Sequence, residues 1–166
     1  LGTMQGRNMP IAGPVAMAAD CCGAPYYIMT PTPPPGGGES TAFSVADSGA
    51  CGWNELSAGN QANAIAYYTS LYGWGLPEPM DMGPMGKYQF IDHDGVTVGA
   101  IMQKRAERPL PVWQHYFRVV SIAEAAKQVE AAGGSITQGP HEVPGDDWIV
   151  VGVDPHGAEF CLVDGK

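Results

Sequence analysis

The stretch that decides the fold is residues 112–134, VWQHYFRVVSIAEAAKQVEAAGG. Its first part, up to Val120, is rich in β-branched and aromatic residues, which is typical of a β-strand. Ser121 and Glu124 then form a capping box, and apolar residues recur at helical spacing until the stop at Gly133-Gly134. The stretch therefore predicts a strand followed directly by a helix.

The same pattern occurs once more, upstream. Residues 52–57 predict a strand, and an apolar stripe predicts a helix that begins after Asn60 and ends at Gly73. The two halves align by residue, and an internal repeat of this period is stronger support for a fold than a single motif. The aligned pairs are Trp53 with Trp113, Gly73 with Gly133, Asp92 with Asp154 and Gly95 with Gly157.

Strands complete each repeat. Residues 87–91 and 96–102 predict a hairpin after the first helix, and three strands are predicted after the second helix, at 135–138, 148–153 and 158–163. Each repeat is thus a βαβββ module, at about 51–105 and 111–166. One helix cannot cover both faces of a sheet, so we expect an α+β fold in which paired modules form a curved mixed sheet around a central cavity.

Residues 1–50 differ from the rest, because they are rich in Gly and Pro and poor in charge. The segment 31–38, PTPPPGGG, is typical of an extended linker. We interpret 1–50 as an arm that either packs on the sheet or reaches a partner. Residues 42–47 resemble 158–164, and this short match is either chance or the mark of a remnant of an upstream module.

Charge and cysteine content limit the partners and the compartment. The net charge is −9, which repels phosphate backbones, so we expect neither nucleic acid nor anionic membrane as a partner. The longest apolar stretch, 9–19, is too short to span a bilayer and contains two prolines. The four cysteines match no zinc spacing and are interpreted as free thiols. These features predict a cytoplasmic protein.

The first strand of each module supplies the candidate site. Side chains alternate along a strand, so Trp53 and Glu55 share one face, and His115 shares the equivalent face with its neighbours Trp113 and Phe117. Such a wall could hold an apolar or aromatic ligand, with Glu55 and His115 as catalytic proton-transfer groups. The equally weighted alternative is that Glu55 and His115 only satisfy each other or the backbone.

Three further features have competing interpretations. Cys161 on the last strand, one of the candidate binding residues, is either a soft metal ligand, a nucleophile or a small packing residue, and packing is favoured. The methionine-rich segment 80–86 either closes over a hydrophobic ligand or forms a dimer contact. Lys104, Arg105 and Arg108 form a small basic patch, for which solvation or a salt bridge is expected.

Several motifs together resemble the vicinal oxygen chelate superfamily, which includes glyoxalases, bleomycin resistance proteins and extradiol dioxygenases, and they are most similar to its glyoxalase-like branch. The resemblance covers about residues 51–166 and implies the paired-module fold and a homodimer. The motifs are Trp53-Asn-Glu-Leu56, Tyr67-Tyr68 with Gly73-Trp74, Met82-Gly-Pro-Met-Gly86, Trp113-x-x-Tyr116-Phe117, Gly133-Gly134, Val143-Pro-Gly145 and Asp154-Pro-x-Gly157-Ala158.

The resemblance also implies positions for a divalent metal, on the first and last strands of each module. These positions carry Trp53, Gly99 or Ala100, His115 and Cys161, of which only His115 is an ordinary ligand. We therefore expect no metal cofactor, or an altered metal site built on His115, Glu55 and Cys161.

Two functions of different class follow. The first is a protein that binds a small, largely apolar or aromatic molecule between its modules, as the drug-resistance members of the family do. Its binding residues would be Trp53, Glu55, Trp113, His115, Phe117 and Cys161. The second is a lyase or isomerase that uses Glu55 and His115 for proton transfer or as ligands of a rearranged metal site. The first is slightly favoured.

Overall fold

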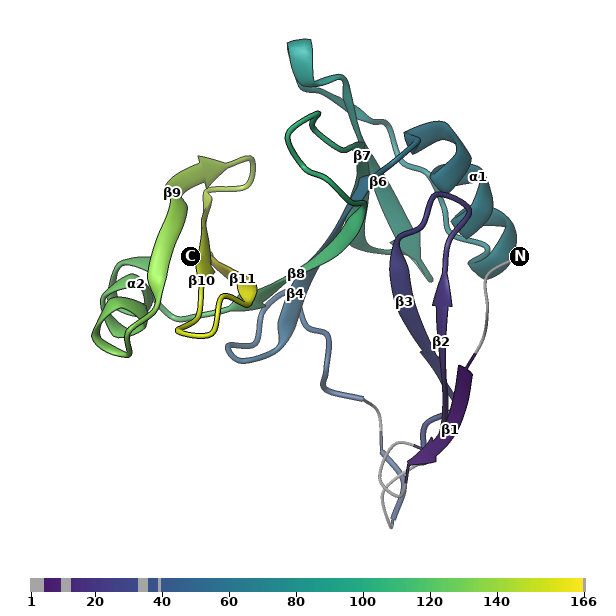
Figure 1. Cartoon of the computed structure of the whole chain (residues 1–166), viewed down its shortest axis with the longest axis horizontal. Helices are drawn as coiled ribbons and strands as arrows, with labels where there is room; N and C mark the ends of the chain where they lie inside the picture. Colours follow the sequence, from purple (N-terminus) through teal and green to yellow (C-terminus); the bar gives the residue numbers. More distant parts are fainter. Residues whose placement is uncertain (1–4, 10–12, 33–35, 39, 166) are drawn as a thin grey trace. The chain divides into compact units, whose positions relative to one another are not determined.

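The computed structural model describes residues 5–9, 13–32, 36–38 and 40–165, and these divide into two compact units. Unit 1 holds the described residues before Ser40 together with Glu55–Trp113, and unit 2 holds Ser40–Asn54 and the described residues from Gln114 onwards. The boundary cuts strands β4 (Cys51–Ala58) and β8 (Val112–Arg118), so each of these strands contributes residues to both units (Figure 1).

Unit 1 contains the first module. After β4 come α1 (Gln61–Tyr72), β5 (Met80–Asp81), the short 3₁₀ helix η1 (Gly83–Met85), β6 (Lys87–His93) and β7 (Val96–Gln103). The strand order is β5-β6-β7-β4, and β6 and β7 are antiparallel. The predicted helix and hairpin are confirmed, and β5 is a short additional strand within the Met-rich segment.

Helix α1 begins and ends where its capping residues require. The backbone N–H of Asn63 donates to the side chain of Asn60, with N and O 2.9 Å apart. Gly73 adopts the left-handed conformation (φ 68°), and its N–H donates to the carbonyl of Thr69. Glycine reaches this conformation without steric cost, which explains why the helix stops there.

The hydrophobic core of unit 1 lies between α1 and one face of its sheet. Tyr68 of the helix packs against Leu56 of β4 and Ile101 of β7, and all three side chains are fully buried. Ala24 from the N-terminal segment is also fully buried in this cluster. A part of the chain that the sequence set aside as an arm therefore contributes to the core.

The N-terminal segment forms its own antiparallel sheet. Its strands are β1 (Gln5–Met9), β2 (Gly13–Ala19) and β3 (Pro25–Met29), in the order β1-β2-β3. Residues 42–47 contain no strand and only an isolated bridge from Phe43 to Cys51. Residues 42–47 therefore do not form a strand like β11 (Glu159–Asp164), with which the sequence aligns them.

Unit 2 contains the second module. Strand β8 is followed by α2 (Ile122–Ala131), β9 (Ser135–Val143), β10 (Asp147–Val153) and β11 (Glu159–Asp164). The strand order is β8-β11-β10-β9, and β11 runs parallel to β8. The predicted α+β class, with two helices and βαβββ modules, is confirmed.

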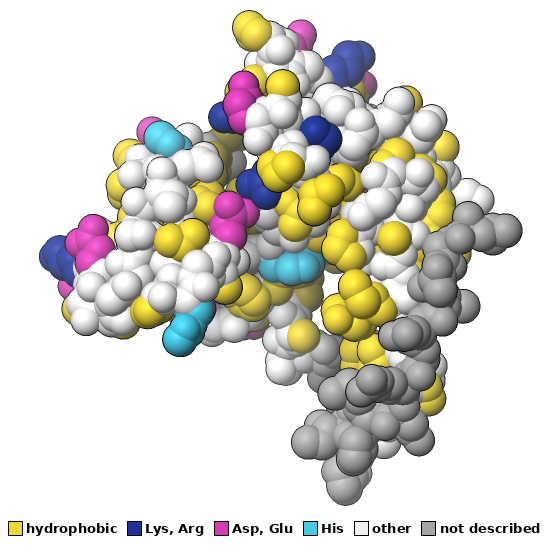
Figure 2. All heavy atoms as spheres, in the orientation of Figure 1, with side chains coloured by type: hydrophobic (Ala, Val, Ile, Leu, Met, Phe, Trp, Pro, Cys, Tyr) yellow, Lys and Arg dark blue, Asp and Glu magenta, His cyan; other side chains and the backbone are white. Residues whose placement is uncertain are grey.

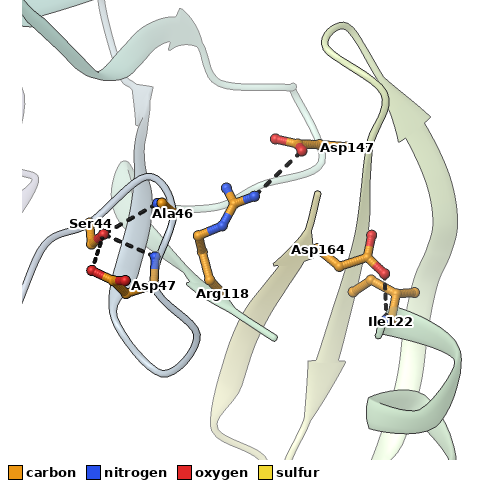
Figure 3. A network of polar contacts seen from close by, with 7 residues as sticks. All are labelled: Ser44, Ala46, Asp47, Arg118, Ile122, Asp147 and Asp164. Atoms are coloured by element: carbon orange, nitrogen blue, oxygen red, sulfur yellow. Dashed lines mark hydrogen bonds and ion pairs between the residues drawn. The ribbon is translucent and has the colours of Figure 1, made fainter. Parts of the chain in front are cut away.

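Polar side chains fix the ends of α2 and β8 in unit 2 (Figure 3). The N–H of Glu124 donates to the hydroxyl of Ser121 at 3.4 Å, and the N–H of Ile122 donates to the Asp164 carboxylate at 2.6 Å. An anionic group at a helix N-terminus is favourable, because the N–H groups there lack partners within the helix. Arg118 at the end of β8 forms an ion pair with Asp147, with N and O 3.6 Å apart.

One turn occurs twice, in the loops 20–24 and 154–158. In each loop the carboxylate of the first residue accepts from the N–H groups of the third and fifth residues, at 2.8–2.9 Å. The N–H of the first residue also donates to the carbonyl of the fifth at 2.9 Å in both loops. The β2–β3 and β10–β11 hairpins therefore have the same connection.

No helix within the described ranges is long and apolar enough to cross a membrane.

Candidate functional site

Glu55 lies in the second half of β4 and is the central polar group of the candidate site. The hydroxyl of Tyr88 on β6 donates to Oε2 of Glu55, with the two oxygens 2.7 Å apart. Burial raises the pKa of the Glu55 carboxyl from its ordinary value of 4.5, and the Tyr88 hydrogen bond and the charges of Arg108 and Arg105 oppose this rise. Desolvation of the charged form is the dominant effect, so the protonated carboxyl is favoured.

The face of the sheet that carries Glu55 is aromatic and apolar. Phe90 lies two residues after Tyr88 on the same face of β6, and their rings meet edge to face with centroids 5.6 Å apart. Ala100 of β7 pairs directly with Phe90. We call Glu55, Tyr88, Phe90 and Ala100 the Glu55 face.

The opposite face of the same strands carries the core residues. Ile91 and Ile101 alternate with Phe90 and Ala100, and both isoleucines pack against α1. Gly99 pairs with Ile91 and therefore belongs to the helix side. Of the two residues that the family resemblance proposed as a metal position on β7, Ala100 is the one on the Glu55 face.

Basic residues follow β7 near this face. Arg105 donates to the sulfur of Met85 in η1 at 3.3 Å, and the Lys104 ammonium donates to the backbone carbonyl of Arg108 at 2.9 Å. Met85 and Leu110 are exposed, and Figure 2 shows Lys and Arg side chains together with hydrophobic ones over η1 and the β7–β8 connection. The basic patch thus places positive charge close enough to lower the pKa of Glu55.

His115 lies in unit 2 and has its own partner. Its Nδ1 is 2.8 Å from Oδ1 of Asn54, and the thiol of Cys51 donates to the same oxygen at 3.4 Å. Because an amide oxygen only accepts, Nδ1 carries the proton and Nε2 of the neutral ring presents a lone pair. Burial lowers the pKa of His115 from its ordinary value of 6.5, so the neutral ring predominates at pH 7.

Three further predicted binding residues also lie in unit 2. Trp53 packs against the hydrophobic cluster of this unit, which includes Tyr116 and the fully buried Cys161. The amide of Gln114 donates to the sulfur of Cys161 at 3.5 Å. Phe117, by contrast, is 46% exposed. Cys161 thus has the surroundings of a packing residue.

Trp113 belongs to the core side of unit 1. Its indole N–H donates to the hydroxyl of Tyr68 at 2.9 Å, and the two rings meet edge to face. It also meets Trp74 edge to face, with centroids 6.1 Å apart. Burial raises the pKa of Tyr68 well above its ordinary value, so this hydroxyl stays protonated.

The sequence predicts that Glu55 and His115 belong to one site, whereas the structure places them in different units. Tyr88 and Phe90 are the candidate site residues that sequence reasoning missed. A signal was present, because Ile91 marks the core side of the 87–91 strand and its alternation places Tyr88 and Phe90 opposite. The sequence does not show that Tyr88 contacts Glu55, because this contact depends on how β4 and β6 are aligned in the sheet.

The metal positions implied by the family resemblance can be tested against their surroundings. Ala100 offers only a methyl group, Trp53 packs in a hydrophobic cluster, and Cys161 is buried beside the amide of Gln114. A divalent metal requires several converging oxygen, nitrogen or thiolate donors. Within the described residues, no three His, Cys, Asp or Glu side chains lie close enough together to hold a metal ion. These residues do not fit the metal centre.

The comparisons with known proteins agree on the fold. No family model matches the sequence. The anthracycline biosynthesis protein DauV of Streptomyces sp. (strain C5) is 30% identical over 128 residues, which are 69% of this chain and 46% of that protein. The chain thus spans about half the length of this curated relative.

Solved structures of low sequence identity share the architecture. Methylmalonyl-CoA epimerase from Mycobacterium tuberculosis is 15% identical with a TM-score of 0.55, covering 74% of this chain and 93% of that one. Homoprotocatechuate 2,3-dioxygenase from Arthrobacter globiformis is 16% identical with a TM-score of 0.64, covering 98% of this chain and 53% of that one. Together with the module order and the repeated motifs, these similarities show that the chain has the fold of the vicinal oxygen chelate superfamily.

Proposed function

We propose that the protein binds a small, largely apolar or aromatic molecule on the Glu55 face of unit 1. The observation that supports this most is the partly buried carboxyl of Glu55 on a face of aromatic and small apolar side chains. Binding sites of this kind combine apolar walls with a few placed polar groups that set orientation. Glu55 and Tyr88 would supply that orientation.

The hydrogen-bond inventory supports a ligand with a carbonyl or hydroxyl group. Tyr88 occupies Oε2 of Glu55, and within the described part of the chain Oε1 has no hydrogen-bond partner. A protonated carboxyl can donate to a ligand carbonyl, and an ionised one can accept from a ligand hydroxyl. The positive charges of Arg105 and Arg108 favour a ligand oxygen that carries negative charge, as in a phenolate or an enolate.

A hydroxyanthraquinone is a suitable probe, because it presents a planar aromatic ring system with carbonyl and hydroxyl groups. The relative DauV is named for anthracycline biosynthesis, which supports this choice. We expect Tyr88→Phe to weaken binding of the probe about tenfold, the loss expected for one hydrogen bond that holds the carboxyl. Isothermal titration calorimetry measures this change directly.

Glu55→Gln tests the carboxyl itself, and Glu78→Gln is its matched control, since Glu78 is an exposed carboxylate of the same unit. We expect Glu55→Gln to weaken binding and Glu78→Gln to leave it unchanged. Equal affinities of the wild type, Tyr88→Phe and Glu55→Gln would place the ligand elsewhere.

Proton-transfer catalysis is the second candidate function, as a lyase or isomerase. The raised pKa of Glu55 and the lowered pKa of His115 are the observations that favour it. Both shifts favour the uncharged form of the side chain, which is a proton donor in Glu55 and a proton acceptor in His115. Deuterium exchange from solvent into a bound ketone or enol would detect such transfer. Its persistence in both Glu55→Gln and His115→Gln would exclude these residues.

The proposal includes the compartment and the assembly. All four cysteines are free thiols, which supports action in the reducing cytoplasm. We propose a homodimer on the basis of the family, and light scattering of the purified chain would measure the assembly. A monomeric mass at micromolar concentration would contradict it.

A further inference from the structure

Cys21 and Cys22 form a thiol pair in the turn between β2 and β3. Their sulfur atoms are 3.4 Å apart, Cys21 is exposed and Cys22 is partly buried. The Cys22 thiol is 3.7 Å from the backbone carbonyl of Asn60, the N-cap residue of α1. The pair is therefore held against the start of a helix within unit 1.

The turn itself does not require cysteine. The equivalent turn 154–158 has the same hydrogen bonds and carries Pro155 and His156 at these two positions. The Asp20 carboxylate and Gly23 (φ 93°) set the backbone, as their counterparts do in the second turn. The two thiols are thus additional to what the backbone needs.

The geometry disfavours a direct bond between the two sulfurs. Consecutive Cα atoms across a trans peptide are about 3.8 Å apart, whereas disulfides usually join Cα atoms at least about 4.4 Å apart. The sulfurs here are also separated by more than a disulfide bond length. An atom that bonds to both sulfurs does not require the sulfurs to come within bonding distance of each other. Their present separation suits two sulfur ligands on one pyramidal atom.

We propose that the thiol pair is a binding site for a trivalent thiophilic centre, with an organic arsenic(III) compound as its chemical class. With phenylarsine oxide, two As–S bonds form as the arsenic–oxygen bond breaks. The two thiol protons leave with that oxygen as one molecule of water. No atom changes oxidation state, so the step needs no oxidant or reductant.

The protonation of the Cys21 thiol supports this class over metal cations. Burial and the adjacent Cys22 raise the pKa of Cys21 to about 11, so the thiol is protonated at pH 7. Zinc binds thiolates, so binding zinc would release thiol protons to the solvent. In the condensation with an arsenic oxide those protons leave within the water that forms, so the net reaction releases none.

The test is intact-protein mass spectrometry of the full chain with phenylarsine oxide in the presence of excess glutathione. We expect one arsenical per chain, retained against glutathione and removed by a small dithiol. The variant Cys21→Pro with Cys22→His carries the residues of the second turn, so we expect it to fold, and a folded variant without the adduct would report the thiols alone. Cys51→Ser is the matched thiol control and should retain the adduct.

Each single variant, Cys21→Ser and Cys22→Ser, should hold the arsenical at least about tenfold more weakly against glutathione, because one As–S bond is lost. Peptide mapping should place the adduct on residues 20–24. An adduct that persists in the double variant, or one that glutathione removes equally from wild type and Cys21→Ser, would overturn the proposal.

Discussion

The charge state of Glu55 connects the candidate site to stability. Burial raises its pKa above 4.5, so the folded chain binds this proton more tightly than the unfolded chain does. The stabilisation is fully present below the unfolded pKa of 4.5 and is lost as the pH rises through the raised, folded pKa. Ionised Glu55 therefore lowers the free energy of unfolding at neutral pH.

Replacing this carboxyl should remove that pH dependence. Glu55→Gln keeps a neutral acceptor for Tyr88, so we expect the melting temperature of the variant to exceed that of the wild type at pH 7 and to approach it near pH 4. Thermal melts from about pH 4 to about pH 8 measure the difference. A Glu78→Gln control should follow the wild type. A constant offset for Glu55→Gln at all pH values would show that Glu55 titrates normally.

Trp113 makes a second prediction at the scale of single residues. Trp113→Phe removes the donor to Tyr68 and should lower the free energy of unfolding by about 1–3 kcal/mol, since the buried hydroxyl loses the indole N–H. Adding Tyr68→Phe should recover part of that loss, because both polar groups are then gone. Chemical denaturation of the two single variants and the double variant measures the coupling. Additive losses would mean that the hydrogen bond contributes nothing.

At the scale of elements, the two equivalent turns predict that one can replace the other. Cys21→Pro with Cys22→His should change the free energy of unfolding by no more than about 0.5 kcal/mol, because Pro155 and His156 occupy the same turn. Asp20→Ala should cost about 1–3 kcal/mol, since the N–H groups of Cys22 and Ala24 lose their acceptor. Urea unfolding compares the variants. Equal losses for both would mean that the two turns are not equivalent.

The elements also show what the sequence could predict. Both helices were predictable, because Asn60, Gly73 and Ser121 act locally and their hydrogen bonds depend on the near sequence. Strands β1, β2 and β3 were not predicted, because Gly and Pro interrupt the alternation of apolar and polar residues in this segment. These strands are stabilised by pairing with one another, which the local sequence does not show. The contact between Glu55 and Tyr88 was likewise unpredictable, since it joins different strands.

At the scale of the molecule, the repeated turn bears on the N-terminal segment. We propose that β1, β2 and β3 are the closing strands of a further module, because their order and their turn match those of β9, β10 and β11. The dioxygenase similarity over 98% of the chain supports this. The edge of β11 that faces away from β10 pairs with the parallel strand β8. By analogy, the edge of β3 that faces away from β2 suits a parallel strand.

Removing residues 1–38 tests how far this segment supports unit 1. The hydroxyls of Tyr26 and Tyr67 are 2.6 Å apart, and Ala24 is fully buried in the core. We expect a loss of about 3–5 kcal/mol, the range for removing a packed aromatic side chain. Hydrogen exchange should show faster exchange in α1 and unchanged exchange in α2. Unchanged protection of α1 would show that the core is complete without the segment.

Ligand binding to the Glu55 face can be observed directly by nuclear magnetic resonance of alanine methyl groups during titration with a hydroxyanthraquinone. Ala100 lies on the Glu55 face and Ala64 lies on the helix side of the same sheet. Binding to the Glu55 face predicts a ring-current shift of the Ala100 methyl signal, assigned with Ala100→Gly, and no shift at Ala64. A bound probe that shifts Ala64, or that leaves Ala100 unmoved, would contradict the assignment of the binding site to the Glu55 face.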